Sequence, residues 1–144
     1  MIGRLAGWPV VFAVLTGGCA IMQIDNTVQR IDSSVGLYWA AAASVKLGDS
    51  KEHVLTTLAP TQTSLSPKER KQSDTFRQGD SIIEIQYFRS GRQPDGLTTD
   101  DEFTPYVFTD GVLTSIGWTS LGGPRSRGQA IQPPPIINQK VIVK

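Results

Sequence analysis

The hydrophobic positions of the chain begin with an apolar run close to the N-terminus. Residues 5–15 (LAGWPVVFAVL) carry no charge, one basic residue precedes them, and Gly17 and Gly18 follow shortly after. A short basic start, an apolar stretch of this length and small residues at its end are typical of a secretory signal. A membrane-spanning helix needs about 20 apolar residues, and Pro9 and the two glycines interrupt this run. The pattern predicts a signal peptide over residues 1–18.

The single cysteine of the chain, Cys19, follows the two glycines directly. Residues 16–19 resemble the lipobox of bacterial lipoproteins, in which cleavage occurs before the cysteine and its thiol carries a diacylglycerol. The resemblance implies a lipid anchor on Cys19, and the alternative is a plain secretory signal with an incidental cysteine. Ala20 stands where the familiar inner-membrane retention signal is aspartate, so the resemblance implies attachment to outer-membrane lipid, facing the periplasm. Three acyl chains make such an anchor effectively permanent.

A stripe of apolar residues at spacings of three and four follows the cysteine and predicts a helix. Polar residues stand between its members, which are Ile21, Ile24, Val28, Ile31, Val35, Tyr38, Ala42 and Val45. Gly36 and the two serines before it favour a break near residues 33–36. We assign residues 19–46 to a lipid-anchored helical tether. Its stripe is expected to pack on the chain's own domain, and a small coiled-coil oligomer is the alternative.

Residues 47–120 have the pattern of a small α+β domain. Asp49 or Ser50 is placed to cap a short helix with an apolar face, and Asp49 and Glu52 have capping-box spacing. Pro60 then ends this helix. The expected architecture is an N-terminal helix or two short helices packed on a small antiparallel sheet of about three to four strands, with an extended proline-rich tail.

Three segments of this domain predict strands. Residues 81–89, 104–109 and 112–118 are rich in β-branched and aromatic residues, and the first is expected to bury one face. Asp110-Gly111 is a strong hairpin signal, which makes the sheet antiparallel. Helix face and sheet face are expected to form one core from Val54, Leu58, Ile83, Ile85, Tyr106, Phe108, Leu113 and Ile116.

Two polar segments interrupt the domain. Residues 61–77 contain clustered basic side chains, which predict a solvated loop. Residues 95–102 form the densest acidic stretch, and calcium prefers such oxygen ligands, but the spacing does not match an EF-hand loop. We therefore expect no metal site and an ordered loop neutralised by Arg89 and Arg92. The weak metal candidates are Asp95, Asp100, Asp101 and Glu102.

The composition changes completely at residues 121–144, which we assign to a proline-rich extended tail. Consecutive prolines favour a stiff extended conformation, and the β-prone residues that follow are suited to strand addition. We predict an arm that contacts a partner through Pro133, Pro134, Pro135, Ile136 and Ile137. The alternative is that the end of the tail returns to the protein's own sheet.

Composition excludes several classes of function. Fourteen basic and thirteen acidic residues leave a net charge of +1, so no nucleic-acid partner is expected. One histidine and one cysteine exclude histidine-rich metal sites and an internal disulfide framework. No nucleophile elbow or phosphate-binding glycine loop is present. We therefore predict a protein that is not an enzyme, with no small-molecule substrate and no cofactor apart from the covalent lipid on Cys19.

The order of these parts resembles the SmpA/OmlA-like small outer-membrane lipoproteins. The resemblance covers residues 45–118. It is carried by a helix motif, Gly48, Ser50, Val54, Leu58 and Pro60, and by a hairpin motif, Tyr106, Val107, Phe108, Asp110, Gly111, Val112 and Leu113. The family has methionine at the position of Asp49 and glycine at that of Ala59. The resemblance implies a small helix-and-sheet unit that acts by binding. The implied function is a scaffold or accessory subunit of a cell-envelope assembly or secretion complex. The alternative is a periplasmic inhibitor or sensor that binds an envelope enzyme.

Overall fold

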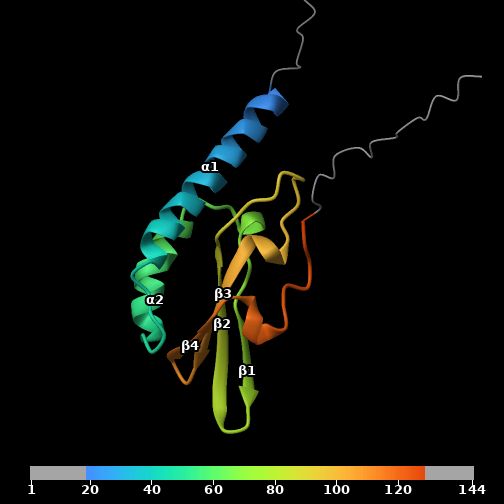
Figure 1. Ribbon diagram of the computed structural model, residues 1–144. Coiled ribbons are helices and arrows are strands. Elements are labelled where there is room, and N and C mark those ends of the chain that lie inside the picture. Colours follow the sequence, from blue (N-terminus) through green and yellow to red (C-terminus); the bar gives the residue numbers. More distant parts are fainter. Residues whose placement is uncertain (1–18, 129–144) are drawn as a thin grey trace, which may run out of the picture.

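The computed structural model describes residues 19–128, with side chains from residue 26 onward. Two helices, α1 (Cys19–Ala42) and α2 (Lys51–Leu58), precede a sheet of four strands. The strands are β1 (Asp74–Gln78), β2 (Ser81–Arg89), β3 (Phe103–Thr109) and β4 (Val112–Ile116). They lie in chain order and each neighbouring pair is antiparallel. Both helices lie against one face of the sheet (Figure 1). The predicted α+β fold is confirmed.

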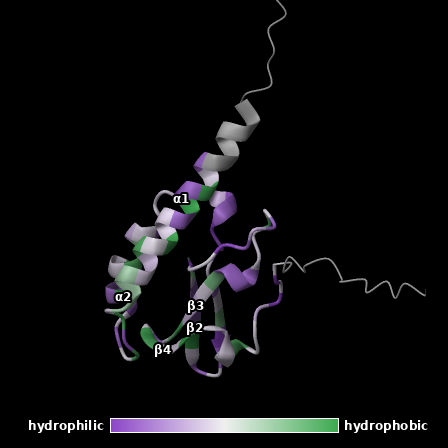
Figure 2. Ribbon diagram, turned by 45° about the horizontal axis from the view of Figure 1, so that its top comes forward, coloured by the Kyte–Doolittle hydropathy of each residue, from purple (hydrophilic) through white to green (hydrophobic). Residues whose placement is uncertain are grey.

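Helix α1 is continuous, so the predicted break near residues 33–36 is wrong. Hydrophilic and hydrophobic residues alternate around it (Figure 2), and its buried side holds Ile31, Ser34 and Tyr38. The Ser34 hydroxyl lies 2.7 Å from the hydroxyl of Ser64. These contacts outweigh the helix propensity cost of Gly36, about 1 kcal/mol. From Ile31 to Val45 the stripe packs on the chain's own domain, as predicted.

Helix α2 begins where the sequence indicates. The Ser50 hydroxyl caps it by accepting a hydrogen bond from the backbone N–H of His53, at 3.2 Å. Asp49 instead accepts from the N–H of Lys46, so the Asp49–Glu52 capping box does not form. Val54 and Leu58 are fully buried against the sheet. The tight turn at Asp110 and Gly111, with φ of 49° and 82°, confirms the predicted hairpin between β3 and β4.

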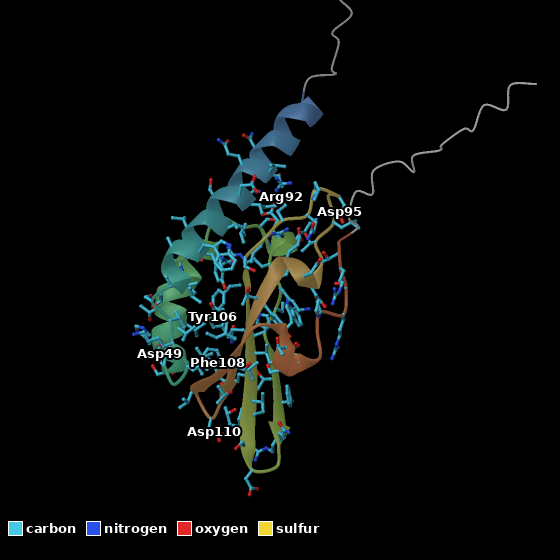
Figure 3. All side chains as sticks on the ribbon, viewed as in Figure 1. Asp49, Arg92, Asp95, Tyr106, Phe108 and Asp110 are labelled. Atoms are coloured by element: carbon cyan, nitrogen blue, oxygen red, sulfur yellow. The ribbon has the colours of Figure 1, made fainter. Side chains whose placement is uncertain are left out.

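The core is divided between the two faces of the sheet. The helix side holds Tyr38, Val54, Leu58, Phe88, Tyr106, Phe108 and Leu113, and Figure 3 shows Tyr106 and Phe108 on that side of β3. Ile83, Ile85 and Val107 form a second cluster with Tyr87 and Leu121. The expectations of one buried face in β2 and of a single core are therefore wrong. Ile116 is also outside the core, with 39% of its surface exposed. The second face is buried because the turn at Trp118–Leu121 returns over it.

The polar segment over residues 61–77 is not a solvated loop, which corrects the prediction. Thr61, Gln62, Leu65 and Glu69 are buried, and the segment ends in β1. The Gln62 amide accepts from the backbone N–H of Arg89 at 2.8 Å and donates to its carbonyl at 3.3 Å. A side-chain amide thus pairs with the main chain at the end of β2. Polar composition concealed this role because burial of a polar group depends on its partner.

Candidate binding site

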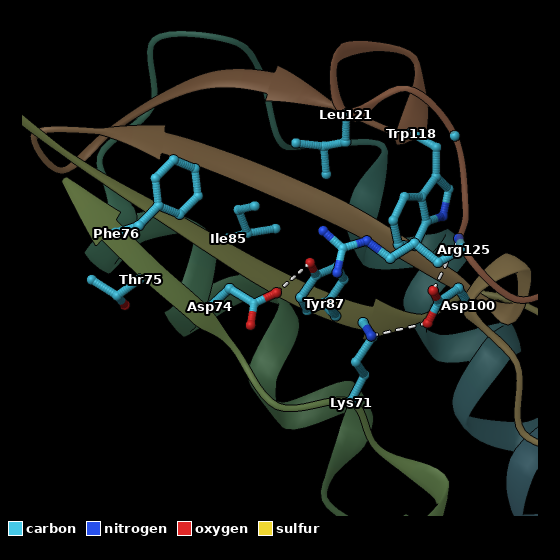
Figure 4. Close-up of a pocket in the computed structure, with 11 residues that line it drawn as sticks. Lys71, Asp74, Thr75, Phe76, Ile85, Tyr87, Asp100, Trp118, Leu121 and Arg125 are labelled. Atoms are coloured by element: carbon cyan, nitrogen blue, oxygen red, sulfur yellow. Dashed lines mark hydrogen bonds and ion pairs between the residues drawn. The ribbon is translucent and has the colours of Figure 1, made fainter. Parts of the chain in front are cut away.

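A cavity of about 370 Å³ lies on the face of the sheet that the helices leave uncovered. Strand register places Asp74 and Phe76 on this face, because Asp74 pairs with Ile85 and Phe76 pairs with Ile83. Tyr87 follows two residues after Ile85 and so points the same way. The turn after β4 and the following residues close the cavity from the other side (Figure 4). We refer to this cavity as the sheet pocket.

Aromatic rings form one wall of the sheet pocket. Tyr87 and Trp118 stack with centroids 5.7 Å apart and an interplanar angle of 30°. The Trp118 indole N–H donates to the carbonyl of Phe103 at 2.7 Å, which fixes the ring. Lys71 Nζ lies 4.8 Å from the centre of the Tyr87 ring. Phe76 remains 47% exposed at the outer rim. The wall therefore offers both aromatic faces and a cation near them.

The charges of the sheet pocket are arranged in pairs. Lys71 Nζ lies 2.9 Å from Asp100 Oδ1, and Asp100 also accepts from the backbone N–H groups of Arg125 and Ser126. Burial raises the pKa of Asp100, but these donors outweigh burial and hold that pKa below its usual value. Asp100 is therefore a carboxylate at neutral pH.

Tyr87 and Arg125 complete the polar lining. The Tyr87 hydroxyl donates to Asp74 at 2.8 Å, and burial together with this bond raises the pKa of Tyr87 far above its usual value. Tyr87 therefore stays a neutral phenol and is no general base at neutral pH. Figure 4 shows the Arg125 guanidinium pointing over Tyr87. Among the described residues Arg125 has no ion-pair partner. Its five N–H donors can bind an acceptor from outside.

The acidic stretch serves the chain's own donors. Glu102 forms a buried ion pair with Arg89, with Nη2 and Oε2 2.8 Å apart, so neutralisation by Arg89 is confirmed. Asp101 accepts from the backbone N–H of Gly128 at 3.0 Å, and Asp95 accepts from that of Leu97. Among the side chains described from residue 26 to 128, no cluster of three or more His, Cys, Asp or Glu residues could hold a metal ion. The weak metal candidates are thus not brought together.

Arg92 neutralises a different element from the one predicted. Its guanidinium lies 2.8 Å from Asp32 Oδ1 of α1, and Arg92 and Asp95 both lie at the end of the domain beside the N-terminal half of this helix (Figure 3). A second cavity of about 470 Å³ opens here, between Val28 and Ile31 of α1 and Leu97 of the loop. It is mainly apolar, with Arg92 at its rim.

Sequence reasoning missed most of the sheet pocket. Lys71, Asp74 and Phe76 belong to the segment interpreted as a solvated loop, and Arg125 belongs to the predicted tail. One signal was available: alternation in residues 81–89 puts Tyr87 on the face opposite Phe88. The partner of that face, Trp118, comes from a turn whose path only the folded chain shows.

Several predicted features fall outside the described part of the chain. These are the signal peptide over residues 1–18 and the partner contacts Pro133, Pro134, Pro135, Ile136 and Ile137. Cys19 is the first residue of α1, and its side chain is not described. Residues 122–128, assigned to the tail, return along the acidic stretch through the hydrogen bonds to Asp100 and Asp101. Among the described helices, none has the length and apolar character to span a bilayer.

Comparison of the chain with models of protein families, with curated proteins and with solved structures found no match.

Proposed function

We propose that the protein is a lipoprotein of the outer membrane, facing the periplasm and anchored by lipid on Cys19. In this proposal it is a binding or scaffold accessory subunit of a cell-envelope assembly or secretion complex. The apolar run and the Gly-Gly-Cys sequence support the anchor. Helix α1 begins at Cys19 and has 24 residues, about 36 Å at 1.5 Å per residue. Its C-terminal half packs on the domain, so one continuous helix would connect the domain to the lipid.

The observation that carries the binding function is the sheet pocket. One sheet face is covered by α1 and α2, while the other presents Tyr87, Trp118 and Arg125 at the surface of a cavity. Tyrosine, tryptophan and arginine are the residue types that contribute most to protein interfaces. The pocket suits an acceptor group opposite Arg125 and an apolar side chain against Phe76. Its titratable groups favour binding over catalysis, since Lys71 and Asp100 are paired and Tyr87 is neutral.

The exposed aromatic side chains also favour a second candidate, a periplasmic inhibitor or sensor of an envelope enzyme. Phe76 is 47% exposed at the rim of the sheet pocket, and an inhibitor inserts such a side chain into the enzyme's cleft. The two candidates differ in their bound partner. An accessory subunit is isolated in a stable complex, whereas removal of an inhibitor changes the activity of the enzyme it binds.

The anchor is tested by replacing Cys19 with serine. In cells given an alkyne fatty acid, the native chain is expected to be labelled and to sediment with membranes. Cys19→Ser is expected to lose the label and to remain as an uncleaved precursor or to become soluble. Unchanged membrane retention together with unchanged processing contradicts the lipoprotein assignment.

The binding face is tested by a photo-crosslinking residue at position 76, in cells that produce the full chain. A matched control carries the same residue at Leu47, which is apolar and 63% exposed but outside the sheet pocket. We expect a discrete adduct from position 76 that is lost in Trp118→Ala and is absent from position 47. Equal adducts from both positions, or none from position 76, contradict the assignment of the binding face.

A further inference from the structure

The two edges of the sheet differ in how their backbone groups are satisfied. Along β4, the N–H of Gly48 donates to the carbonyl of Leu113, and the N–H of Leu113 donates to the carbonyl of Asp49, both at 2.9 Å. The N–H of Lys51 donates to Gly111 at the same distance. The segment before α2 therefore covers the start of the β4 edge, up to Leu113, which shortens the stretch open to strand addition.

The edge at β1 is open within the described residues. The backbone groups of Ile82 both point toward β3, because its carbonyl accepts from Asp110 N–H and its N–H donates to the Asp110 carboxylate. Arg77 is the register partner of Ile82. The backbone N–H and carbonyl of Arg77 therefore point away from β2. Alternation along an antiparallel pair places Thr75 in the same state. Within residues 19–128 no hydrogen bond satisfies these outward groups.

The side chains of β1 are exposed, and one of them is large and apolar. All five residues of β1 are exposed, and Phe76 projects beside the sheet pocket with 47% of its surface in contact with solvent. Natural edges are usually protected by charge, by proline or by a covering segment. Asp74 and Arg77 place charge on β1, but within residues 19–128 no strand pairs with its outer side. An added strand would bring an apolar side chain next to Phe76 and satisfy the outward groups of Thr75 and Arg77.

The chain itself carries a segment that can reach this edge. Arg125 lines the same pocket as Thr75, and the described part ends three residues later at Gly128, which Asp101 holds by hydrogen bonds. Residues 141–143 (VIV) are β-branched throughout and suit a strand. The twelve residues between Gly128 and position 141 can span about 37 Å at 3.1 Å each. That exceeds the length of β2, about 30 Å at 3.3 Å per residue.

We propose that residues 141–143 add to the open edge of β1 as a fifth strand of the same molecule. A tether of this length holds the segment at millimolar effective concentration near the edge, which favours pairing within one chain over pairing between copies. The proline tract at residues 133–135 then acts as a stiff connector. Residues 141–143 would then return to the protein's own sheet, which is the alternative to the predicted partner arm. The added strand would lie beside Phe76, which is also the expected partner contact, so the exchange experiment uses the purified chain without a partner.

Amide hydrogen exchange on the full chain, purified in detergent, tests the proposal. The native chain is expected to exchange the Thr75 and Arg77 amides at least tenfold more slowly than Ile142→Pro, because proline interrupts the added strand. Gln132→Pro is the matched control: it lengthens the proline tract without touching the strand and is expected to behave as the native chain. The Phe76 amide, which points toward β2, is the internal reference and is expected to be equally protected in all three.

Two results would overturn the proposal. Equal exchange of Thr75 and Arg77 in the native chain and in Ile142→Pro means that residues 141–143 do not pair with β1. Protection that rises with protein concentration, together with dimers in sedimentation, means that a second copy supplies the strand. The described fold does not include position 142, so a change confined to Thr75 and Arg77 is distinguishable from general unfolding.

Discussion

Replacing Glu102 with alanine removes the acceptor of the most deeply buried ion pair in the described domain. The side chains of Arg89 and Glu102 are 1% and 0% exposed. Glu102 accepts from Arg89 Nη2 at 2.8 Å, from the N–H of Gln93 at 2.6 Å and from the N–H of Thr99 at 3.1 Å. Three donors, one of them charged, would lose their acceptor together. This carboxylate therefore joins the end of β2 to the start of β3 and to the loop between them.

The expected cost is about 3–5 kcal/mol, the range for breaking a buried ion pair by deleting one partner. The two backbone donors add to this cost, and relaxation of the loop recovers part of it, so we expect about 4 kcal/mol. Typical domains are stable by only about 5–15 kcal/mol. Glu102→Ala is therefore expected to be close to unfolding at 37 °C.

Urea denaturation followed by tryptophan fluorescence measures this loss, since Trp39 and Trp118 both lie in the domain. With a slope of about 2 kcal/mol per molar urea, the midpoint is expected to fall by about 2 M. Asp32→Ala is the matched control, because its partner Arg92 forms an exposed pair worth about 0–1 kcal/mol. A loss for Glu102→Ala no larger than that of the control would refute the argument.

Three further predictions concern stability in the same denaturation assay. Leu58→Ala is expected to cost about 2–5 kcal/mol because it opens a cavity in the helix-side core. Ile116→Ala, at a position 39% exposed, is expected to cost under about 1.5 kcal/mol. Similar losses for both variants contradict this assignment of the core. The hydroxyls of Tyr38 and Tyr106 lie 3.0 Å apart in the core. Either single change to phenylalanine is therefore expected to cost about 1–3 kcal/mol, and the double change is expected to cost much less than the sum of the two. Additive losses in the double-mutant cycle refute the coupling of the two hydroxyls. The lowered pKa of Asp100 contributes stability that is fully present above the pKa of the unfolded state and is lost as the pH falls below about 4. Asp100→Asn is expected to flatten this part of the dependence of stability on pH. An unchanged dependence in this variant contradicts the stabilising role of the Asp100 carboxylate.

Local features of the fold could be predicted because they depend on residues close in the chain. Ser50 caps α2 through its own next turn, and Asp110-Gly111 forms its hairpin with positive φ at both positions. The strand over residues 81–89 follows from its composition. These interactions need no information from distant segments, and all three agree with the structure.

The candidate site could not be predicted to the same extent. Its residues come from β1, β2, the turn after β4 and the returning segment at Arg125. Two of these segments have polar compositions typical of solvated loops. Sequence patterns measure the average exposure of a residue type, whereas each polar side chain here is placed by one particular partner, as Lys71 is by Asp100.

The sequence by itself determined the α+β class, the cap of α2 and the β3–β4 hairpin, while the signal peptide and the lipid on Cys19 stay predictions. The tertiary structure decided that α1 is continuous, that each sheet face carries a buried cluster and that Gln62 and Glu102 belong to the interior. The physical reason is the range of the interactions: caps and turns are satisfied within a few residues. Burial of Gln62 instead depends on Arg89, 27 residues away, and that pairing exists only once the chain has folded.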